Sequence, residues 1–120
     1  MQSKINLLGE SLCLDEALRR CLTERGYTIR VLRSWSDLPA EEPGVGNEPV
    51  VLLFDIDVEE NIGNKLNEMK RKHPGCFLLA VSTGNYHPEL AEAIGKHLFA
   101  LLVRPIDWDE LFYLLNGIER

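Results

Sequence analysis

Two patterns of apolar residues alternate along the chain of 120 residues. Short, nearly unbroken apolar runs show no helical period and are typical of strands buried on both faces. Between them lie longer stretches whose apolar residues recur every three or four positions, which is the spacing of an amphipathic helix. The pattern predicts strands over residues 4–8, 28–32, 50–57, 76–81 and 100–103, and helices over residues 11–25, 59–73, 88–97 and 108–118.

Residues that start or stop helices support these boundaries. In the first helix the apolar residues, Leu14 among them, share one face, and Gly26 ends the helix. Asp107 and Glu110 have the spacing of a capping box, which marks the start of the last helix. Prolines and glycines crowd the segment 34–49, so it is predicted to be a loop with at most one helical turn.

Strands that alternate with helices imply a parallel sheet, because each right-handed crossover places its helix on one face of the sheet. We therefore expect a doubly wound α/β fold, with a five-stranded parallel sheet and helices on both faces. A chain of 120 residues has room for one domain, and no internal linker is long enough to separate two folding units. Residues 1–120 are thus predicted to form a single domain.

Composition and charge exclude several classes of partner. The formal net charge is −6, and no basic stripe offsets the acids, so direct contact with nucleic acid or an anionic membrane is not expected. No apolar run approaches the roughly 20 residues of a membrane span, and the start of the chain lacks the pattern of a signal peptide. A cytoplasmic location is therefore expected. Cys13, Cys21 and Cys76 have no metal-ligand spacing and are predicted to be reduced thiols.

Two carboxylates end the most apolar predicted strand. In the run VVLLFDID at residues 50–57, Asp55 and Asp57 follow five apolar residues. The carboxyl ends of parallel strands meet at one edge of a sheet, where such folds bind ligands. At that edge the other strands contribute Gly9-Glu10, Ser82-Thr83-Gly84 and Arg104-Pro105. Acids, hydroxyl groups and one cation together form a set suited to holding a phosphoryl group.

These residues resemble the response-regulator receiver domain, a flavodoxin-like module that accepts a phosphoryl group from a histidine kinase. Asp55 stands where the family has its acceptor aspartate, and Thr83-Gly84 where it has Ser or Thr before a small residue. Arg104-Pro105, followed by the capped helix, matches the family's Lys-Pro except at the first residue. The resemblance spans the whole chain and implies Asp55, Thr83 and Arg104 as site residues. Without it, the favoured explanation of Asp55 is a strand-end residue that caps the next helix or pairs with Arg104, and Thr83 is equally well explained as a turn residue.

The chain differs from the family at residues that would bind the metal. Where the family has two adjacent acids after its first strand, this chain has Gly9-Glu10. The resemblance implies a magnesium ion that neutralises the phosphoryl oxygens, so the loss of one acid predicts a weak site formed by Glu10, Asp55 and Asp57. Residues i and i+2 of a strand point the same way, so the Asp57 side chain is a candidate replacement for the missing acid.

Other differences from the family concern residues that respond to phosphorylation rather than residues that bind the metal. Arg104 replaces the family's lysine, and its planar guanidinium is suited to bridging Asp55 in the resting protein. Leu101 replaces an aromatic residue that acts in the family as a rotamer switch. Phosphorylation at Asp55 by a kinase or a small phosphodonor, and a pseudo-receiver that works without phosphorylation, therefore both stay open.

The sequence thus predicts a regulatory domain, not an enzyme, that acts on an attached or separate effector, either as a separate small protein or as the first domain of a longer regulator. The resemblance implies a homodimer through the fourth helix, fifth strand and fifth helix, with Leu101, Trp108 and Phe112 as the residues to test. Two alternatives remain. A ligand-binding flavodoxin-like domain lacks a glycine-rich phosphate loop here, and a phosphocysteine carrier lacks its cysteine at Gly9.

Overall fold

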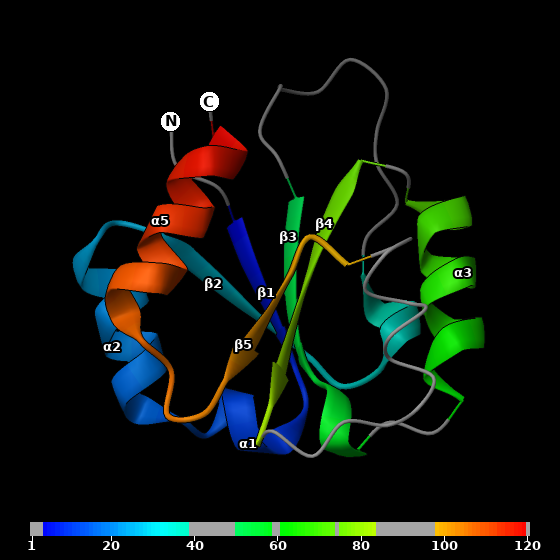
Figure 1. Cartoon of the computed structure of the whole chain (residues 1–120), viewed down its shortest axis with the longest axis horizontal. Coiled ribbons are helices and arrows are strands. Elements are labelled where there is room, and N and C mark those ends of the chain that lie inside the picture. The colour runs from blue at the N-terminus through cyan, green and yellow to red at the C-terminus, as the bar shows by residue number, and fades with distance from the viewer. Residues whose placement is uncertain (1–3, 39–49, 59–60, 74, 84–97, 120) are drawn as a thin grey trace.

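A computed structural model of the chain describes residues 4–38, 50–58, 61–73, 75–83 and 98–119. Its five strands form one sheet in which every neighbouring pair is parallel, in the order β2-β1-β3-β4-β5 (Figure 1). This confirms the predicted doubly wound sheet. The strands are β1 (Lys4–Leu8), β2 (Thr28–Leu32), β3 (Val50–Asp55), β4 (Cys76–Ser82) and β5 (Ala100–Val103).

Helices cover both faces of the sheet. In Figure 1 helices α2 and α5 lie on one side of the sheet, and α3 lies on the other. Two short 3-10 turns, η1 and η2, follow β2 and β3. The described helical elements are α1 (Glu10–Cys13), α2 (Glu16–Glu24), η1 (Trp35–Asp37), η2 (Ile56–Val58), α3 (Ile62–Lys72) and α5 (Trp108–Glu119). The predicted fourth helix, at residues 88–97, lies outside the described residues.

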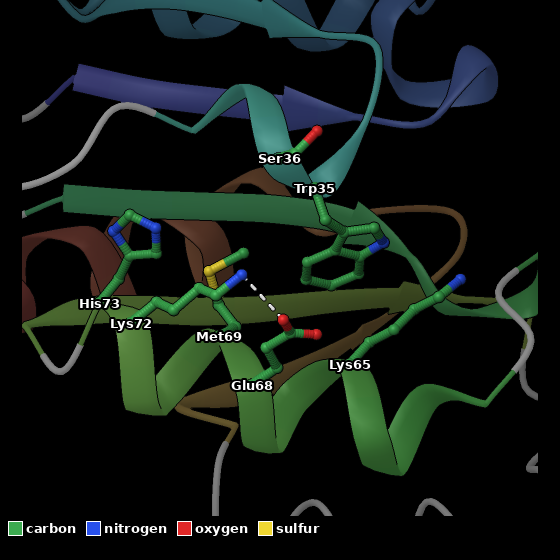
Figure 2. A pocket seen from close by; sticks show the side chains of 7 residues that line it. All are labelled: Trp35, Ser36, Lys65, Glu68, Met69, Lys72 and His73. Carbon is green, nitrogen blue, oxygen red and sulfur yellow. Dashed lines mark ion pairs between the residues drawn. The ribbon is translucent and has the colours of Figure 1, made fainter.

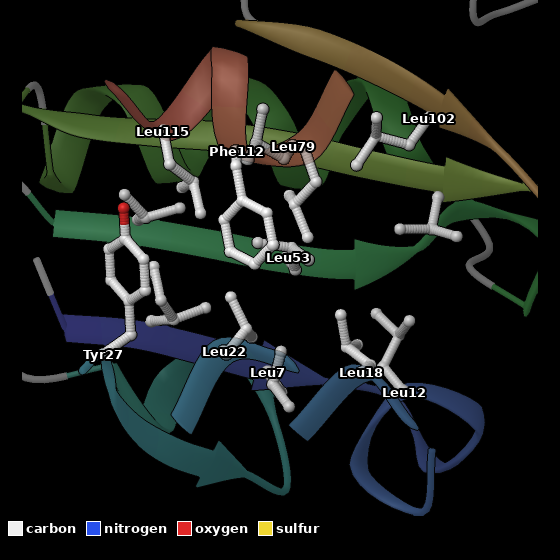
Figure 3. Packing of buried hydrophobic residues seen from close by; sticks show 14 of the residues in the cluster. Leu7, Leu12, Leu18, Leu22, Tyr27, Leu53, Leu79, Leu102, Phe112 and Leu115 are labelled. Carbon is white, nitrogen blue, oxygen red and sulfur yellow. The ribbon is translucent and has the colours of Figure 1, made fainter. Parts of the chain in front are cut away.

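The alternation of side chains along β3 divides the core into two layers. Leu53 packs with apolar residues of α2 and α5, as Figure 3 shows, whereas Leu52 and Phe54 pack with residues of α3. All of these strand residues are fully buried. Successive residues of a strand point to opposite faces, so a strand buried on both sides must be apolar at every position. That requirement explains the unbroken apolar run before Asp55.

The predicted first helix is in fact two helices. Asp15 accepts a hydrogen bond from the backbone N–H of Leu18 at 3.0 Å and so caps α2, while α1 ends at Cys13. The break moves Leu14 off the apolar face. Its side chain is 67% exposed, so its predicted place in the core is wrong. An aspartate inside a helical pattern competes with the helix by capping a new one, and this signal outweighed the apolar spacing.

The predicted ends of two helices are confirmed. Gly26 has φ of 90°, a left-handed conformation that suits glycine, and the N–H of Tyr27 donates to the carbonyl of Leu22 at 3.0 Å, which completes the helix end. At the start of α5, an Asp107 carboxylate oxygen accepts from the backbone N–H of Asp109 at 3.0 Å.

Phe112 is not a surface residue. Its side chain is only 7% exposed and belongs to the core layer between α5 and α2 (Figure 3). Its ring centroid lies 6.3 Å from the ring centroid of Tyr27. The Arg25 guanidinium carbon lies 4.3 Å from the ring centroid of Phe112. The expectation that Phe112 contributes to a dimer face is therefore wrong. The apolar period of the last helix turns this residue toward the sheet.

The described part of the chain contains no helix long and apolar enough to cross a membrane. None of Cys13, Cys21 and Cys76 forms a disulfide in the described part of the chain, in agreement with the predicted reduced thiols.

Replacement of Phe112 by alanine should lower the free energy of unfolding by about 3–5 kcal/mol, because it removes a buried ring and leaves a cavity. The neighbouring Tyr113 is 78% exposed, so Tyr113→Ala is the matched control and should change stability by less than about 0.5 kcal/mol. Urea unfolding followed by circular dichroism measures both. Equal effects at the two positions would contradict the burial of Phe112.

Candidate functional site

Asp55 is the last residue of β3, and both of its carboxylate oxygens are bound by the chain itself. Only 6% of the residue is exposed. The Ser11 hydroxyl donates to Oδ2 at 2.5 Å, and the backbone N–H of Asp57 donates to Oδ1 at 3.0 Å. Hydrogen bonds to a charged group offset the cost of burying it. The local donors therefore hold Asp55 in place at the edge of the sheet.

Arg104 reaches Asp55 chiefly through Ser11. Its Nη2 atom donates to the Ser11 hydroxyl at 3.0 Å and lies 3.9 Å from Asp55 Oδ2. The guanidinium thus sits at the long limit of an ion pair, without the two-pronged contact that the arginine fork permits. Because Ser11 accepts from Arg104, its own proton is free to point at Asp55. The three residues form a directed chain of hydrogen bonds.

Ser11 is a site residue that the sequence did not single out. It lies in the short helix α1, which begins directly after the turn that follows β1. A hydroxyl in the first turn after a parallel strand is a weak signal, since serine is also a common residue at helix starts. Because the first helix breaks after Cys13, α1 is a separate short helix, and it contacts β3.

Asp57 lies in the 3-10 turn η2, not in the strand, and its side chain faces β4. Oδ1 accepts from the Ser82 hydroxyl at 2.9 Å, and Oδ2 accepts from the backbone N–H of Thr83 at 2.7 Å. The expectation that Asp57 points the same way as Asp55 depended on a strand continuing to residue 57. Strand β3 ends at Asp55, so that premise is wrong.

The end of β4 contributes Ser82 rather than the Thr83 side chain. Ser82 is fully buried and bonds Asp57 through its hydroxyl, whereas Thr83 is exposed and contributes its backbone N–H. The sequence contains two adjacent hydroxyl residues here, and only the strand's register decides which one faces the site. The backbone N–H of Arg104 donates to the Ser82 carbonyl at 2.8 Å, which ties β5 to this corner.

Gly9 is fixed by backbone conformation and by its distance from Asp55. Its φ is 110°, which side chains rarely tolerate, and a Cβ atom built there would lie 3.4 Å from the Asp55 Cβ. Glu10, the next residue, is exposed in the first turn of α1. The acid that the family carries at position 9 is therefore replaced by a residue that lets the chain turn close to Asp55.

A magnesium ion fits these residues poorly. Glu10, Asp55 and Asp57 were the predicted ligands, but the described residues contain no group of three acidic, histidine or cysteine side chains arranged to hold a metal. Asp55 already accepts from Ser11 and Asp57 already accepts from Ser82. Magnesium requires nearly octahedral oxygen ligands, so these side chains would have to turn toward a common centre to bind it.

Cys13 lies near this edge but is a poor nucleophile. Its Sγ donates to the carbonyl of Leu7 at 3.5 Å. Burial raises the pKa of the Cys13 thiol, and the nearby Arg19 charge offsets this only in part. The thiolate is the reactive form of cysteine. These contacts disfavour a phosphocysteine carrier that uses Cys13.

No protein-family model matches the chain, and no curated protein matches it in sequence. Solved structures match its fold. The signal receiver domain of an HD domain-containing protein from Pseudomonas fluorescens Pf-5 has a TM-score of 0.75 at 17% identity, over 98% of this chain and 94% of that one. A CheY-like response regulator receiver domain protein from Methanospirillum hungatei JF-1 has a TM-score of 0.73 at 15% identity, over 98% and 93%. This chain has the receiver-domain fold.

The same flavodoxin-like fold occurs in a response regulator from Thermotoga maritima, with a TM-score of 0.74 at 11% identity and 98% of both chains covered. Identities this low establish the fold and leave the chemistry to the residues. In the receiver fold of this chain, Asp55, Ser82 and Arg104 end or directly follow three neighbouring strands, β3, β4 and β5. The sheet order thus brings together residues that are far apart in the sequence.

Restoring an acid at position 9 should destabilise the protein. Gly9→Ala should cost about 1–3 kcal/mol of unfolding free energy because the glycine conformation is strained for other residues. Gly9→Asp should cost more, since it adds a charge beside Asp55. Gly63→Ala is the matched control: Gly63 lies in α3 with open space around it, and alanine there should stabilise by up to about 1 kcal/mol. A Gly9→Ala variant as stable as the native chain in urea would contradict this account.

Proposed function

We propose that this chain is a receiver-like regulatory domain that acts on an attached or separate effector in its unphosphorylated state. The observation that carries the proposal is the occupation of the site by the chain's own groups. Ser11 and the Asp57 N–H satisfy the Asp55 carboxylate, and the Asp57 carboxylate takes the donors at the end of β4. A domain of this kind carries a signal through its surface and has no substrate to convert.

The Asp57 carboxylate supplies a negative charge that phosphorylation would otherwise bring. The Ser82 hydroxyl and the Thr83 N–H form a small anion-binding corner, because both donate into the same space at the end of β4. Asp57 fills this corner with its two oxygens. A phosphoryl group attached to Asp55 would have to displace Asp57 to reach these two donors. The resting structure therefore holds the corner in an anion-bound form.

Phosphorylation at Asp55 is the second candidate, with a histidine kinase or a small phosphodonor as the source. The position of Asp55 at the carboxyl end of β3 and the nearby Arg104 charge favour it. Against it stand the exchange of partners that Asp55 would need and the poor fit of magnesium, which would have to be held by Glu10, Asp55 and Asp57. Without a bound cation, the carboxylate and the incoming phosphate oxygens repel each other.

The contact surface proposed for the effector or for a second copy of the chain is formed by β5 and α5. Val103 and Tyr113 are large apolar residues that are 45% and 78% exposed on these elements. They replace Phe112 as the residues to test, while Leu101 and Trp108 are half-buried and pack against the core. Exposed apolar side chains of this size are common anchors of protein interfaces.

Incubation with acetyl phosphate and magnesium should leave the intact mass of the native chain unchanged. The reason is that Ser11 and the Asp57 N–H engage the two Asp55 oxygens, and that the described residues contain no preformed group of metal ligands. Asp55→Asn is the control, and its mass should behave identically. One added phosphoryl group on the native chain that is absent from Asp55→Asn would refute the proposal and establish Asp55 as a phosphoacceptor.

Replacement of Asp57 by alanine should release both donors at the end of β4. Unfolding free energy should fall by about 1.5–3 kcal/mol, because hydrogen bonds to a charged group are lost. The backbone N–H signal of Thr83 should shift in ¹H–¹⁵N spectra and exchange faster with solvent. Ser82→Ala removes one of the two bonds and should have the smaller effect on Thr83. An unchanged Thr83 signal in Asp57→Ala would show that Asp57 does not occupy this corner.

A further inference from the structure

The outer face of helix α5 carries a large aromatic side chain and, one turn further on, a glycine. Leu111, Leu115 and Ile118 of this helix are buried, so Tyr113 and Gly117 lie on the side that is turned away from the sheet. The Tyr113 side chain is 78% exposed. Residues four positions apart in a helix are neighbours on its surface. The outer face of α5 therefore has a projecting ring directly beside a position without a side chain.

Nothing in the described part of the chain requires a glycine at position 117. Helix α5 continues through it to Glu119, and the described glycines with a left-handed conformation are Gly9 and Gly26. A Cβ atom built at Gly117 meets no atom within 4 Å. Glycine within a helix is destabilising relative to alanine. Close approach by a second chain is a reason for such a glycine, because a side chain there would hold the two chains apart.

Tyr113 and Gly117 complement each other across a two-fold axis. When the α5 helices of two copies cross in antiparallel directions near Leu115, the Tyr113 ring of each copy lies over Gly117 of the other. A two-fold contact of this kind uses the same surface patch twice and closes at two copies. The ring fills the gap that the missing side chain leaves between two packed helices, whose axes lie about 8–10 Å apart. A second copy of the chain therefore supplies both halves of the match.

The charge of α5 favours the antiparallel direction. Asp109 and Glu110 are exposed in the first turn of the helix. A parallel pair of helices would place the acids of both copies side by side, and like charges in contact oppose binding. The antiparallel pair keeps the two acidic starts at opposite ends of the contact.

Helix α3, on the other face of the sheet, lacks this arrangement. Figure 2 shows Glu68 and Lys72 of α3 joined by an ion pair of 2.8 Å, and their side chains are 53% and 60% exposed. Charged side chains of this kind are typical of a helix face that stays in water. Gly63 also lies in α3 with open space around it, but the residues four positions away are Glu59 and Asn67. Gly63 therefore serves as the matched control for Gly117.

We propose that two copies of the chain associate through the outer faces of α5, with the Tyr113 ring of each copy packed over Gly117 of the other. The inference rests on the proposed function, because it names a second copy as the partner of the α5 surface. A single crossing of two helices buries less than the roughly 800 Å² per partner of a standard interface. The contact is therefore weak, with a dissociation constant on the order of 100 μM.

Sedimentation equilibrium of the native chain at up to about 1 mM should show a reversible equilibrium that ends at two copies. Dimerisation should strengthen when salt rises from about 0.05 to 0.5 M, because each copy has a formal net charge of −6 and salt screens the repulsion. A chain that stays monomeric at these concentrations, or that grows beyond two copies, would overturn the proposal.

Gly117→Ala separates the contact from the fold. The added methyl group should raise the urea midpoint of the monomer, since alanine favours the helix, and should weaken dimerisation about 5-fold or more, since it separates the two helices. Gly63→Ala should raise the midpoint in the same way and leave dimerisation unchanged. A loss of dimerisation in Gly63→Ala equal to that in Gly117→Ala, or no loss in Gly117→Ala, would contradict the two-fold contact.

Tyr113→Ala removes the projecting ring and should weaken dimerisation about 10-fold or more. Leu14→Ala is its control, because Leu14 is a large apolar residue that is 67% exposed outside α5, and it should leave dimerisation unchanged. Equal losses in the two variants would show general apolar association and refute the α5 contact.

Isotope-filtered NOE spectra of an equal mixture of ¹³C-labelled and unlabelled native chain test the pairing itself. Contacts between copies should join the Tyr113 ring protons to the Gly117 α protons. A dimer that lacks these contacts would overturn the proposal. The mass measurement with acetyl phosphate decides the proposed function and these spectra decide the α5 contact, so failure of one is distinguished from failure of the other.

Discussion

The buried carboxylate of Asp55 is the constraint around which this end of the molecule is arranged. A carboxylate that is 6% exposed must find donors within the protein, since burial removes most of its water. Ser11 and the Asp57 N–H are those donors, and Arg104 stands behind Ser11. Each partner comes from a different segment that follows a strand, so satisfying one side chain fixes the relative positions of three segments at the carboxyl edge of the sheet.

Two turns follow from this arrangement. The chain must pass close to Asp55 after β1 for Ser11 to reach it, and Gly9 permits the approach with its positive φ. After Asp55 the backbone must turn so that the Asp57 N–H points back at the carboxylate, and η2 makes that turn. The same turn directs the Asp57 side chain to Ser82 and Thr83. The hydrogen bonds of the site thus follow, one after another, from the burial of the Asp55 carboxylate.

The fold was predictable because it depends on burial. Apolar runs located all five strands, and capping and glycine signals placed the end of α2 and the start of α5. The break after α1 was missed because the apolar spacing runs through Leu14, while the cap at Asp15 is decided by the backbone. The spacing of apolar residues identifies which side of an element faces the sheet. It carries no information on where one helix ends and the next begins.

The site was only partly predictable, because side-chain direction after a strand depends on the turn that follows. The places of Asp55 and Arg104 at or directly after strand ends follow from the sequence, and the structure brings the two side chains to 3.9 Å from each other. Ser11 and Ser82 were missed, and the predicted direction of the Asp57 side chain was wrong. A side chain two residues after Asp55 points one way in a continuing strand and another way in a 3-10 turn, and Asp57 lies in such a turn. Hydroxyl residues are too common at turns and helix starts to identify a partner by sequence alone.

The most direct test of the central claim is a high-resolution crystal structure of the chain grown in magnesium. Our account predicts that Ser11 remains bonded to Asp55 and that the Asp57 carboxylate remains bonded to the Ser82 hydroxyl and the Thr83 N–H, with no metal ion among Glu10, Asp55 and Asp57. A magnesium ion held by these three residues, with Asp57 turned away from β4, would contradict it and would restore the phosphoacceptor interpretation.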